Sequence, residues 1–242
     1  MTAQLFLVES LPPGERCVLA GPEGHHAADV LRLRAGEELL LGDGQGGTAR
    51  ARVTAAGRGS LELCLLSRWY AQPPDPRLVV VQGIAKGERG ELAVQAMTEV
   101  GVDALVPWAA ARSVAQWRGE RGDRALARWC ATAREAAKQA RRPWLPRVFP
   151  AESTAQVAQR LGAAAAGFVL HEEADARLAG VALPAAGEVV LVVGPEGGVA
   201  PEELAFFTQA GAIPVRLGET VLRTSTAGVA ALSVLSARLG RW

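Results

Sequence analysis

Short apolar segments separated by turn residues occupy the chain up to about residue 70. The strand candidates are residues 5–8, 16–19, 38–41, 49–53 and 61–65. Turn sequences such as Gly42-Asp43-Gly44 lie between them, as expected for strands that reverse direction. One short helix is predicted to begin near His25 and to end before Gly36. Several short strands in so few residues predict a small barrel.

A proline-rich stretch at residues 72–76 cannot continue a helix or a central strand, so it is interpreted as a linker. It divides the chain into a domain of residues 1–72 and a domain of residues 73–242. In the second domain, strands are predicted at 78–82, 104–108, 167–171, 189–193 and 213–217, and helices at 87–100, 119–142, 201–210 and 225–239. This alternation predicts an α/β fold with a mostly parallel sheet covered by helices on both faces.

The composition is that of a globular protein. Apolar residues make up 49% of the 242 positions, which is enough for a core and excludes extensive disorder. No segment approaches the ~20 apolar residues of a membrane helix, and no secretory signal is visible, so a soluble cytoplasmic protein is expected. Cys17, Cys64 and Cys130 are interpreted as small buried side chains. Ligand spacing for a metal is absent.

The net charge of +1 conceals a basic segment. Residues 112–147 contain ten basic and three acidic residues, so this segment carries +7 and the remainder −6. In the predicted helix at 119–142, Leu126, Trp129, Ala133, Ala136 and Ala140 form an apolar stripe. Arg134, Lys138, Arg141 and Arg142 fall on a different face. That face is interpreted as a polyanion-binding surface; a merely solvated helix face is the alternative.

Two similar segments near the carboxyl terminus carry the strongest functional signal. The strand at 189–193 runs into Gly194-Pro195-Glu196-Gly197-Gly198, and a second strand runs into residues 217–227. Loops at the carboxyl ends of strands bind ligands in open α/β sheets, so we expect one pocket shared between neighbouring strands. Residues 194–198 suit a phosphate at a helix N-terminus, a nucleoside clasped by backbone groups, or a tight turn without a ligand. They match neither Gly-x-Gly-x-x-Gly nor a P-loop.

The second loop adds a charge. Arg223 precedes a helix whose first-turn hydroxyls, on Thr224, Ser225 and Thr226, suit N-capping. A charged arginine beside the other loop needs a partner such as a carboxylate or phosphate. The equal alternative to a catalytic role is a structural ion pair that fixes the loop. His171 ends a third strand and could add a third wall with its neighbours Leu170 and Glu172, but alone it would more often be a surface histidine.

Residues 191–198 together with 217–227 resemble the signature of the RsmE family of 16S ribosomal RNA (uracil-N3)-methyltransferases, in the SPOUT superfamily. The resemblance covers nearly the whole chain. Residues 26–32 with 42–44 resemble the family's amino-terminal PUA-like RNA-binding barrel. Residues 86–89, with Gln95, Glu99 and Gly101, resemble the start of its catalytic domain, and residues 138–142 its central basic motif.

The resemblance implies a deep trefoil knot, a homodimer with the active site at the subunit interface, 16S ribosomal RNA as partner, no metal, and S-adenosylmethionine (SAM) as cofactor. The implied SAM-binding residues are Leu170, His171, Glu172, Val193, Gly194, Pro195, Glu196, Gly197, Gly198, Leu217, Gly218, Val221, Leu222, Thr224, Ser225 and Thr226. The implied RNA-binding residues are Arg32, Arg34, Lys86, Arg89, Arg134, Lys138, Arg141 and Arg142. Ser225 and Lys138 stand where many relatives carry Glu, so no general base is assigned.

Methyl transfer to uracil N3 requires an unpaired base and loss of the N3 proton. Arg223 is the candidate for stabilising the negative charge that develops on the uracil, and Arg142 for holding phosphate or base.

Two other functions stay open: a ribosome-assembly factor that binds RNA without chemistry, and an ordinary Rossmann-type nucleotide enzyme. The latter is disfavoured because no acidic ribose partner follows the glycine-rich loop at the expected place.

Overall fold

The computed structural model describes residues 3–242, which form two units. One unit comprises the residues up to Pro73 together with Ala137–Leu145. The other comprises Pro74–Ala136 and Pro146–Trp242. Each unit has its own apolar core, and a short segment from the middle of the chain therefore belongs with the amino-terminal residues.

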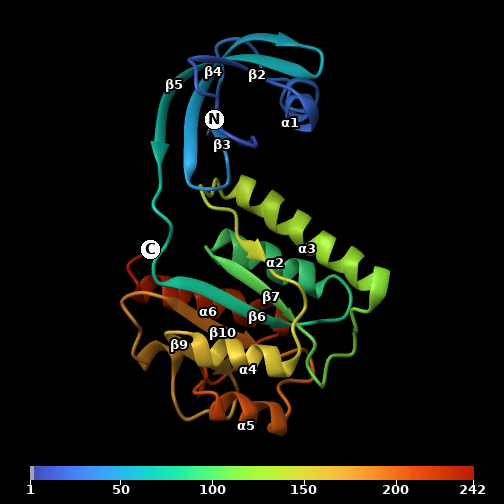
Figure 1. Ribbon diagram of the computed structural model, residues 1–242, viewed down its shortest axis with the longest axis vertical. Helices are drawn as coiled ribbons and strands as arrows, with labels where there is room; N and C mark the ends of the chain where they lie inside the picture. The colour runs from blue at the N-terminus through green and yellow to red at the C-terminus, as the bar shows by residue number, and fades with distance from the viewer. Residues whose placement is uncertain (1–2) are drawn as a thin grey trace. The chain divides into compact units, whose positions relative to one another are not determined.

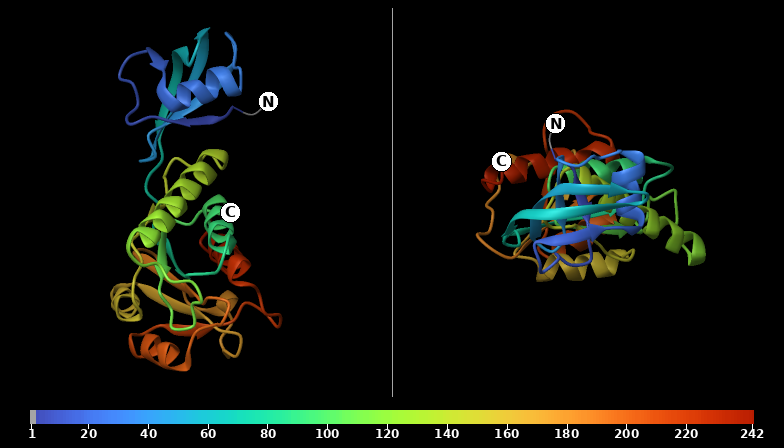
Figure 2. Two further views of the ribbon diagram at one scale, coloured as in Figure 1. Left: turned by 90° about the vertical axis from the view of Figure 1, so that its right-hand side faces the viewer. Right: turned by 90° about the horizontal axis from the view of Figure 1, so that it is seen from above.

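The N-terminal unit is built on a five-stranded mixed sheet (Figures 1 and 2). Its strands are β1 (Leu5–Leu7), β2 (Arg16–Leu19), β3 (Glu38–Gly42), β4 (Gly47–Gly57) and β5 (Ser60–Tyr70), in the order β1-β3-β4-β5-β2. β1 pairs with β3 in parallel, and the other ladders are antiparallel. All five predicted strands are present, with β4 and β5 longer than expected. Within residues 3–242 no ladder joins β1 to β2, so hydrogen bonds do not close the sheet into a barrel.

The helical segment of this unit begins earlier than predicted. Helix α1 (Gly21–His25) continues directly into a π-helical turn, η1 (His26–Val30). Gly21 has φ +65° and Pro22 stands in the first turn, where the missing proline N–H would have no helical partner. Leucine and alanine side chains of the segment that follows α1 pack on the core of the sheet.

Residues 137–145 return to this sheet. Gly46 N–H donates to the Pro143 carbonyl at 2.9 Å, and the Trp144 indole N–H donates to the Ala71 carbonyl at 2.9 Å. The Trp144 ring also meets Tyr70 edge to face, with centroids 6.1 Å apart. The basic motif at residues 138–142 is therefore part of the N-terminal unit, although it follows the linker by more than sixty residues.

The C-terminal unit contains a six-stranded sheet in which every ladder is parallel. The strands are β6 (Arg77–Gly83), β7 (Ala104–Trp108), β8 (Arg147–Val148), β9 (Ala166–Leu170), β10 (Glu188–Val193) and β11 (Ile213–Val215), in the order β11-β9-β10-β6-β7-β8 (Figure 1). The predicted parallel sheet is confirmed. The central strands β6 and β10 are almost wholly buried, as expected for a sheet covered on both sides.

Helices cover both faces of this sheet, as predicted. Helices α2 (Arg89–Glu99), α3 (Gly119–Gln139) and α6 (Thr224–Arg238) pack on one apolar core. Helices α4 (Thr154–Ala163) and α5 (Pro201–Gln209) pack on the other. The sequence analysis missed α4, β8 and a short 3-10 turn, η2 (Leu178–Gly180). A signal for α4 was present, because Ser153 and Gln156 form a capping box at its start.

Helix α3 differs from the prediction at its end. It stops at Gln139 and not at Arg142. Arg141 adopts a left-handed conformation with φ +51°, while Arg142 N–H donates to the Ala137 carbonyl at 2.9 Å and Arg141 N–H to the Lys138 carbonyl at 3.0 Å. This is the Schellman arrangement that ends many helices, usually with glycine at the left-handed position. An arginine holds that position here.

The predicted faces of α3 need two corrections. Trp129, Ala133 and Ala136 are buried as expected, but Leu126 is half-buried and Ala140 is exposed. Lys138 was predicted on the exposed basic face and is instead 7% exposed, with Nζ 2.9 Å from Oε1 of Glu23. A buried lysine requires such a carboxylate, and Glu23 lies too far away in sequence for helical periodicity to reveal it.

Three further expectations concern chemistry outside the site. Cys17 and Cys64 are half-buried and Cys130 is exposed, so the interpretation of all three as buried was wrong. Among the residues described, no helix combines the length and the apolar composition needed to cross a membrane. The trefoil knot remains a prediction.

Candidate functional site

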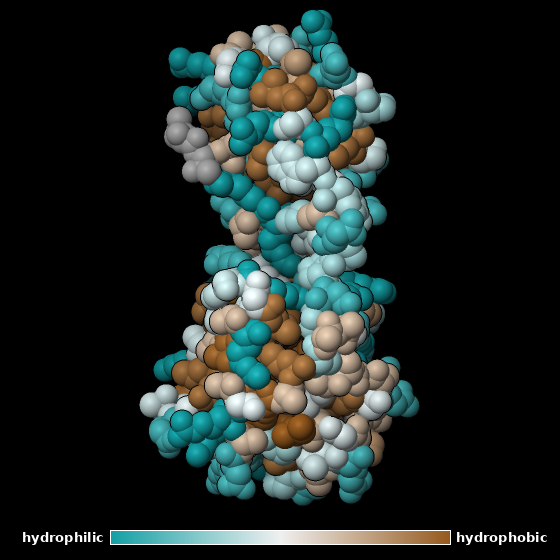
Figure 3. All heavy atoms as spheres, turned by 90° about the vertical axis from the view of Figure 1, so that its left-hand side faces the viewer, coloured by the Kyte–Doolittle hydropathy of each residue, from teal (hydrophilic) through white to brown (hydrophobic). Residues whose placement is uncertain are grey.

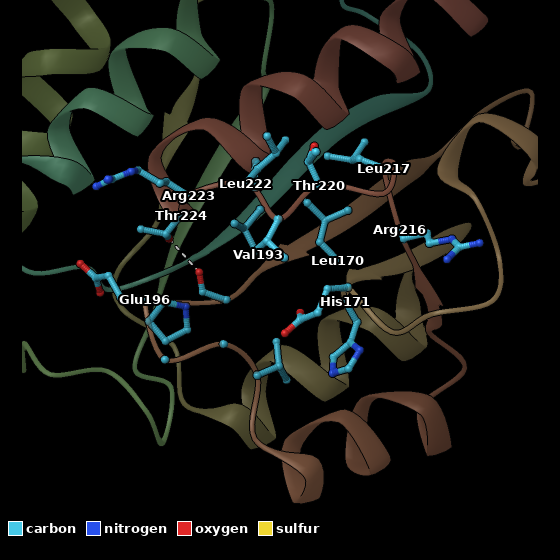
Figure 4. Close-up of a pocket in the computed structure, with 18 of the residues that line it drawn as sticks. Leu170, His171, Val193, Glu196, Arg216, Leu217, Thr220, Leu222, Arg223 and Thr224 are labelled. Atoms are coloured by element: carbon cyan, nitrogen blue, oxygen red, sulfur yellow. Dashed lines mark hydrogen bonds between the residues drawn. The ribbon is translucent and has the colours of Figure 1, made fainter.

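A pocket of about 440 Å³ lies where strands β9, β10 and β11 end (Figure 4). In the sheet, β9 lies between β10 and β11. The two glycine-containing loops therefore follow strands that are not neighbours, and the segment after β9 fills the place between them. The expected single pocket is present, and Leu170, His171 and Glu172, suggested as a third wall, are part of its lining.

Most residues expected at a SAM site line this pocket. They are Leu170, His171, Glu172, Val193, Gly194, Pro195, Glu196, Gly197, Gly198, Leu217, Gly218, Val221, Leu222 and Thr224, together with Arg223. Ser225 and Thr226 are not part of the lining. The lining also includes Arg89, Val199, Val215, Arg216, Thr220 and Ala227, of which Thr220 and Ala227 lie within the segment 217–227 that was expected to form the pocket.

The carboxylate of Glu196 fastens the glycine-rich loop to the loop after β6. Its Oε1 accepts hydrogen bonds from Lys86 N–H at 3.0 Å and from Arg89 Nη1 at 3.2 Å. Partial burial raises the pKa of Glu196, but these hydrogen bonds, that of its own N–H and the Arg89 charge outweigh burial and leave the pKa below its usual value. Arg89, expected as an RNA contact, thus lies in the pocket wall and is paired with Glu196.

Thr224 joins the start of α6 to the same loop. Its Oγ1 donates to the Gly194 carbonyl at 2.7 Å and accepts from Nε2 of Gln82, a fully buried side chain, at 2.8 Å (Figure 4). The prediction that these hydroxyls cap the helix was wrong: Arg223 is the N-cap without a side-chain hydrogen bond, and Thr226 Oγ1 donates to the Arg223 carbonyl. The hydroxyl of Thr224 is used to hold two loops together.

Close backbone approaches shape the pocket floor. A Cβ added at Gly83, the last residue of β6, would lie 2.5 Å from the backbone nitrogen of Pro195. A Cβ added at Gly194 would lie 3.1 Å from the carbonyl carbon of Gly198. At Gly83 a side chain would force the backbone apart, and at Gly194 it would leave a tight contact, so glycine suits both positions. The sequence contained a signal for Gly83, because a glycine ends an otherwise apolar strand there.

Arg223 is exposed on the pocket rim (Figure 4). Over residues 3–242 its side chain has neither a hydrogen bond nor an ion pair, so the structural ion pair considered above is not formed. His171 lies on the opposite side, where its Nδ1 accepts a hydrogen bond from Glu173 N–H at 3.3 Å.

The expected RNA-binding residues differ in their surroundings. Arg32, Arg34, Arg134 and Arg141 are exposed, Lys86 is exposed beside the pocket, and Arg142 is half-buried. Arg32 and Arg141 share an unusual backbone, with φ +57° and +51°, and these are the non-glycine residues with positive φ in the described chain. Lys138 is removed from this group by its burial against Glu23.

Two protein families match separate parts of the chain. Residues 72–236 match the RNA methyltransferase domain family, and residues 19–65 match the RNA methyltransferase PUA domain family. A protein of Mycobacterium bovis named ribosomal RNA small subunit methyltransferase E is 51% identical over all of this chain and 94% of its own length. The protein of that name from Bacillus subtilis is 29% identical over 90% of this chain and 88% of its own.

Solved structures agree with these relationships. The ribosomal RNA small subunit methyltransferase E of Neisseria gonorrhoeae, solved with S-adenosyl methionine bound, has a TM-score of 0.87 and 27% identity, and the match covers 98% of each chain. A putative methyltransferase of Legionella pneumophila, solved with SAM, has a TM-score of 0.86 and 27% identity, also over 98% of each chain. These matches cover nearly the whole chain, so its fold has counterparts in these proteins, and the chain belongs to the ribosomal RNA small subunit methyltransferase E family.

Proposed function

We propose that this chain transfers the methyl group of SAM to N3 of a uridine in the decoding region of 16S ribosomal RNA. The observation that carries the proposal is the pocket at the ends of β9, β10 and β11, in a chain of this family. Ligands of open parallel sheets bind at this edge. Because the substrate is ribosomal RNA, the protein works in the cytoplasm.

The residues of the pocket fit SAM. Its volume lies within the range of small-molecule sites. Leu170, Val193, Leu217 and Leu222 offer apolar surface for an adenine ring, and the glycines of residues 194–198 let ligand atoms approach backbone N–H and C=O groups. Bound SAM supplies an electrophilic methyl carbon on a sulfonium, and its transfer to N3 leaves S-adenosylhomocysteine.

The chain's own residues must align the uracil and stabilise charge. N3 gives up its proton to water ahead of N3–C bond formation, so negative charge develops over N3 and the adjoining carbonyl oxygens. Arg223 is our candidate for stabilising that charge, because it lies on the pocket rim with no competing carboxylate among the described residues. We assign no general base.

The N-terminal unit supplies the RNA contacts. Arg32, Arg34, Arg141 and Arg142 belong to it, since residues 137–145 are built into its sheet. Lys86 and Arg134 add positive charge from the other unit. Phosphate contacts of this kind position RNA without reading its sequence, and they make affinity sensitive to salt.

A homodimer completes the proposal. Apolar side chains reach the surface of the C-terminal unit (Figure 3). Val221 and Leu222 on the pocket rim are 77% and 39% exposed, and Leu92 on α2 is 54% exposed. Exposed large apolar groups beside a site are typical of interaction surfaces. Light scattering after size exclusion should give twice the chain mass, and Val221→Asp should lower it. A wild-type mass of one chain would contradict the dimer.

The decisive experiment combines binding with product mapping. Calorimetry should detect SAM binding, and small subunits from cells lacking the protein should gain one N3-methyluridine in 16S ribosomal RNA when incubated with protein and SAM. RNA binding without SAM heat would favour an assembly factor, and heat with NAD or ATP would favour a Rossmann-type enzyme. For Arg223, a Lys variant with normal SAM binding and full turnover would exclude the catalytic role.

A further inference from the structure

Glu203 is a buried carboxylate that the proposed reaction does not use. Its side chain belongs to the first turn of α5, the helix that follows the glycine-rich loop, and the residue is 6% exposed. Its hydrogen-bond donors are all neutral: Ala111 N–H and Thr154 Oγ1 donate to Oε1 at 2.8 Å each, and Ala200 N–H donates to Oε2 at 3.2 Å. Within residues 3–242 no ion pair offsets its charge.

A buried charge without a cation is expensive and calls for a reason. The bond to Ala200 N–H is the ordinary capping-box contact, which Gln would make as well. The bonds to Ala111 and Thr154 are different, because they reach the loop after β7 and the start of α4. One carboxylate thereby fixes three chain segments at a single point next to the pocket loop.

The residue after Ala111 contacts that loop directly. Arg112 Nη1 donates to the Gly197 carbonyl at 3.1 Å. The fit is close, because a Cβ added at Gly197 would lie 2.9 Å from the Cβ of Arg112. Arg112 is not part of the pocket lining, so it holds Gly197 from behind while Glu196 is held from the other side by Arg89.

We propose that Arg112 and Glu203 are positioning residues for the methyl donor: Glu203 fixes the backbone beside Arg112, and Arg112 holds the 194–198 loop in the shape that forms one wall of the pocket. The inference rests on the proposed function, in which SAM occupies this pocket. A preformed loop binds its ligand more tightly because less ordering accompanies binding.

The test uses the full chain and compares Arg112→Ala, Arg112→Lys, Glu203→Gln and the control Arg118→Ala. Arg118 is an exposed arginine of the same segment, and its side chain has no partner among the residues described. Arg112→Ala should weaken SAM affinity in calorimetry about tenfold, the usual effect of losing one charge-assisted hydrogen bond. The KM for SAM should rise by the same factor with kcat nearly unchanged. Glu203→Gln should shift both values the same way, and Arg112→Lys should recover part of the loss.

Hydrogen exchange of the ligand-free protein separates this inference from the proposed function. Faster exchange of the Gly198 and Val199 amides in Arg112→Ala, with Arg118→Ala unchanged, supports the positioning role of Arg112. This holds even if the wild-type protein fails to bind SAM. Unchanged exchange and unchanged SAM affinity in Arg112→Ala overturn it, whatever the wild type does. A lower melting temperature with normal SAM affinity also overturns it, because that result describes a residue that only stabilises the fold.

Discussion

Replacing Arg141 with glycine should make the protein more stable and a weaker RNA binder. Arg141 stands just after helix α3 at φ +51°, with the backbone hydrogen bonds of Arg142 to Ala137 and of Arg141 to Lys138 closing the helix end. Glycine at this position keeps both bonds and removes the crowding of Cβ. The side chain has no partner among the described residues, so no folded-state contact opposes the gain.

The magnitude follows from two opposing terms. The left-handed conformation costs an L-residue roughly 1–2 kcal/mol. Relief of this strain raises the free energy of unfolding. Glycine also lowers it by about 0.4–1 kcal/mol, because glycine has more freedom in the unfolded chain. The expected net stabilisation is about 0.5–1 kcal/mol, which for a chain of this size corresponds to roughly 2 °C in the melting temperature. Ala131→Gly, at an exposed position inside the same helix, is the control for glycine in a helix and should lose about 1 kcal/mol.

The affinity for RNA should fall while the stability of the protein rises. If Arg141 contacts a phosphate, Arg141→Gly should bind a 16S ribosomal RNA fragment more weakly. The slope of log affinity against log salt should then decrease by slightly less than one. Calorimetric melting and fluorescence anisotropy at several salt concentrations provide the two quantities. A lower melting temperature would refute the backbone argument, and an unchanged affinity and slope would show that this arginine is only solvated.

Three other changes test the loops and the C-terminal end. Arg241→Ala removes the guanidinium 3.0 Å from the buried carboxylate of Asp103 and should destabilise the protein by about 2 kcal/mol in chemical denaturation; a loss below about 0.5 kcal/mol would show that the pair is dispensable. Gly83→Ala introduces a Cβ 2.5 Å from Pro195 N and should lower both stability, by about 2 kcal/mol, and SAM affinity; normal SAM binding would contradict the floor described here. The folded-state pKa of Glu196 is lowered, so its stabilisation is present above the usual value of 4.5 and is lost as the pH falls through the depressed value. Wild type should therefore melt above Glu196→Gln at neutral pH, and the difference should shrink below about pH 4.5; a constant difference would exclude this linkage.

Local sequence patterns were sufficient for five strands of the parallel sheet and for most of the pocket wall. Strand β7 at Ala104–Trp108 coincides with its predicted range, because a short run of apolar residues forms a buried strand with little dependence on distant contacts. The pocket loops were found for a similar reason: a strand, a glycine-containing turn and a helix start are all visible within a few residues.

Contacts between distant residues explain what was missed. Lys138 looked like part of an exposed basic face, but its partner Glu23 lies 115 positions away. Arg89 was expected at the RNA, and its partner Glu196 lies 107 positions away. Periodicity assigns a charged residue to a face of its own helix and contains no information about which other segment covers that face. The missed helix α4 is different, since its capping box was readable in the sequence.

The return of residues 137–145 to the N-terminal sheet means that the two units cannot be separated by one cut. The chain passes from one unit to the other at Pro73–Pro74, at Ala136–Ala137 and at Leu145–Pro146. A protease acting on the proline-rich connection alone would leave the amino-terminal fragment held to the rest of the chain by the contacts of residues 137–145. Expressing residues 1–73 by themselves would also omit the segment whose Pro143 and Trp144 bind Gly46 and Ala71. Any attempt to transplant the N-terminal unit into another protein would have to carry that internal segment with it.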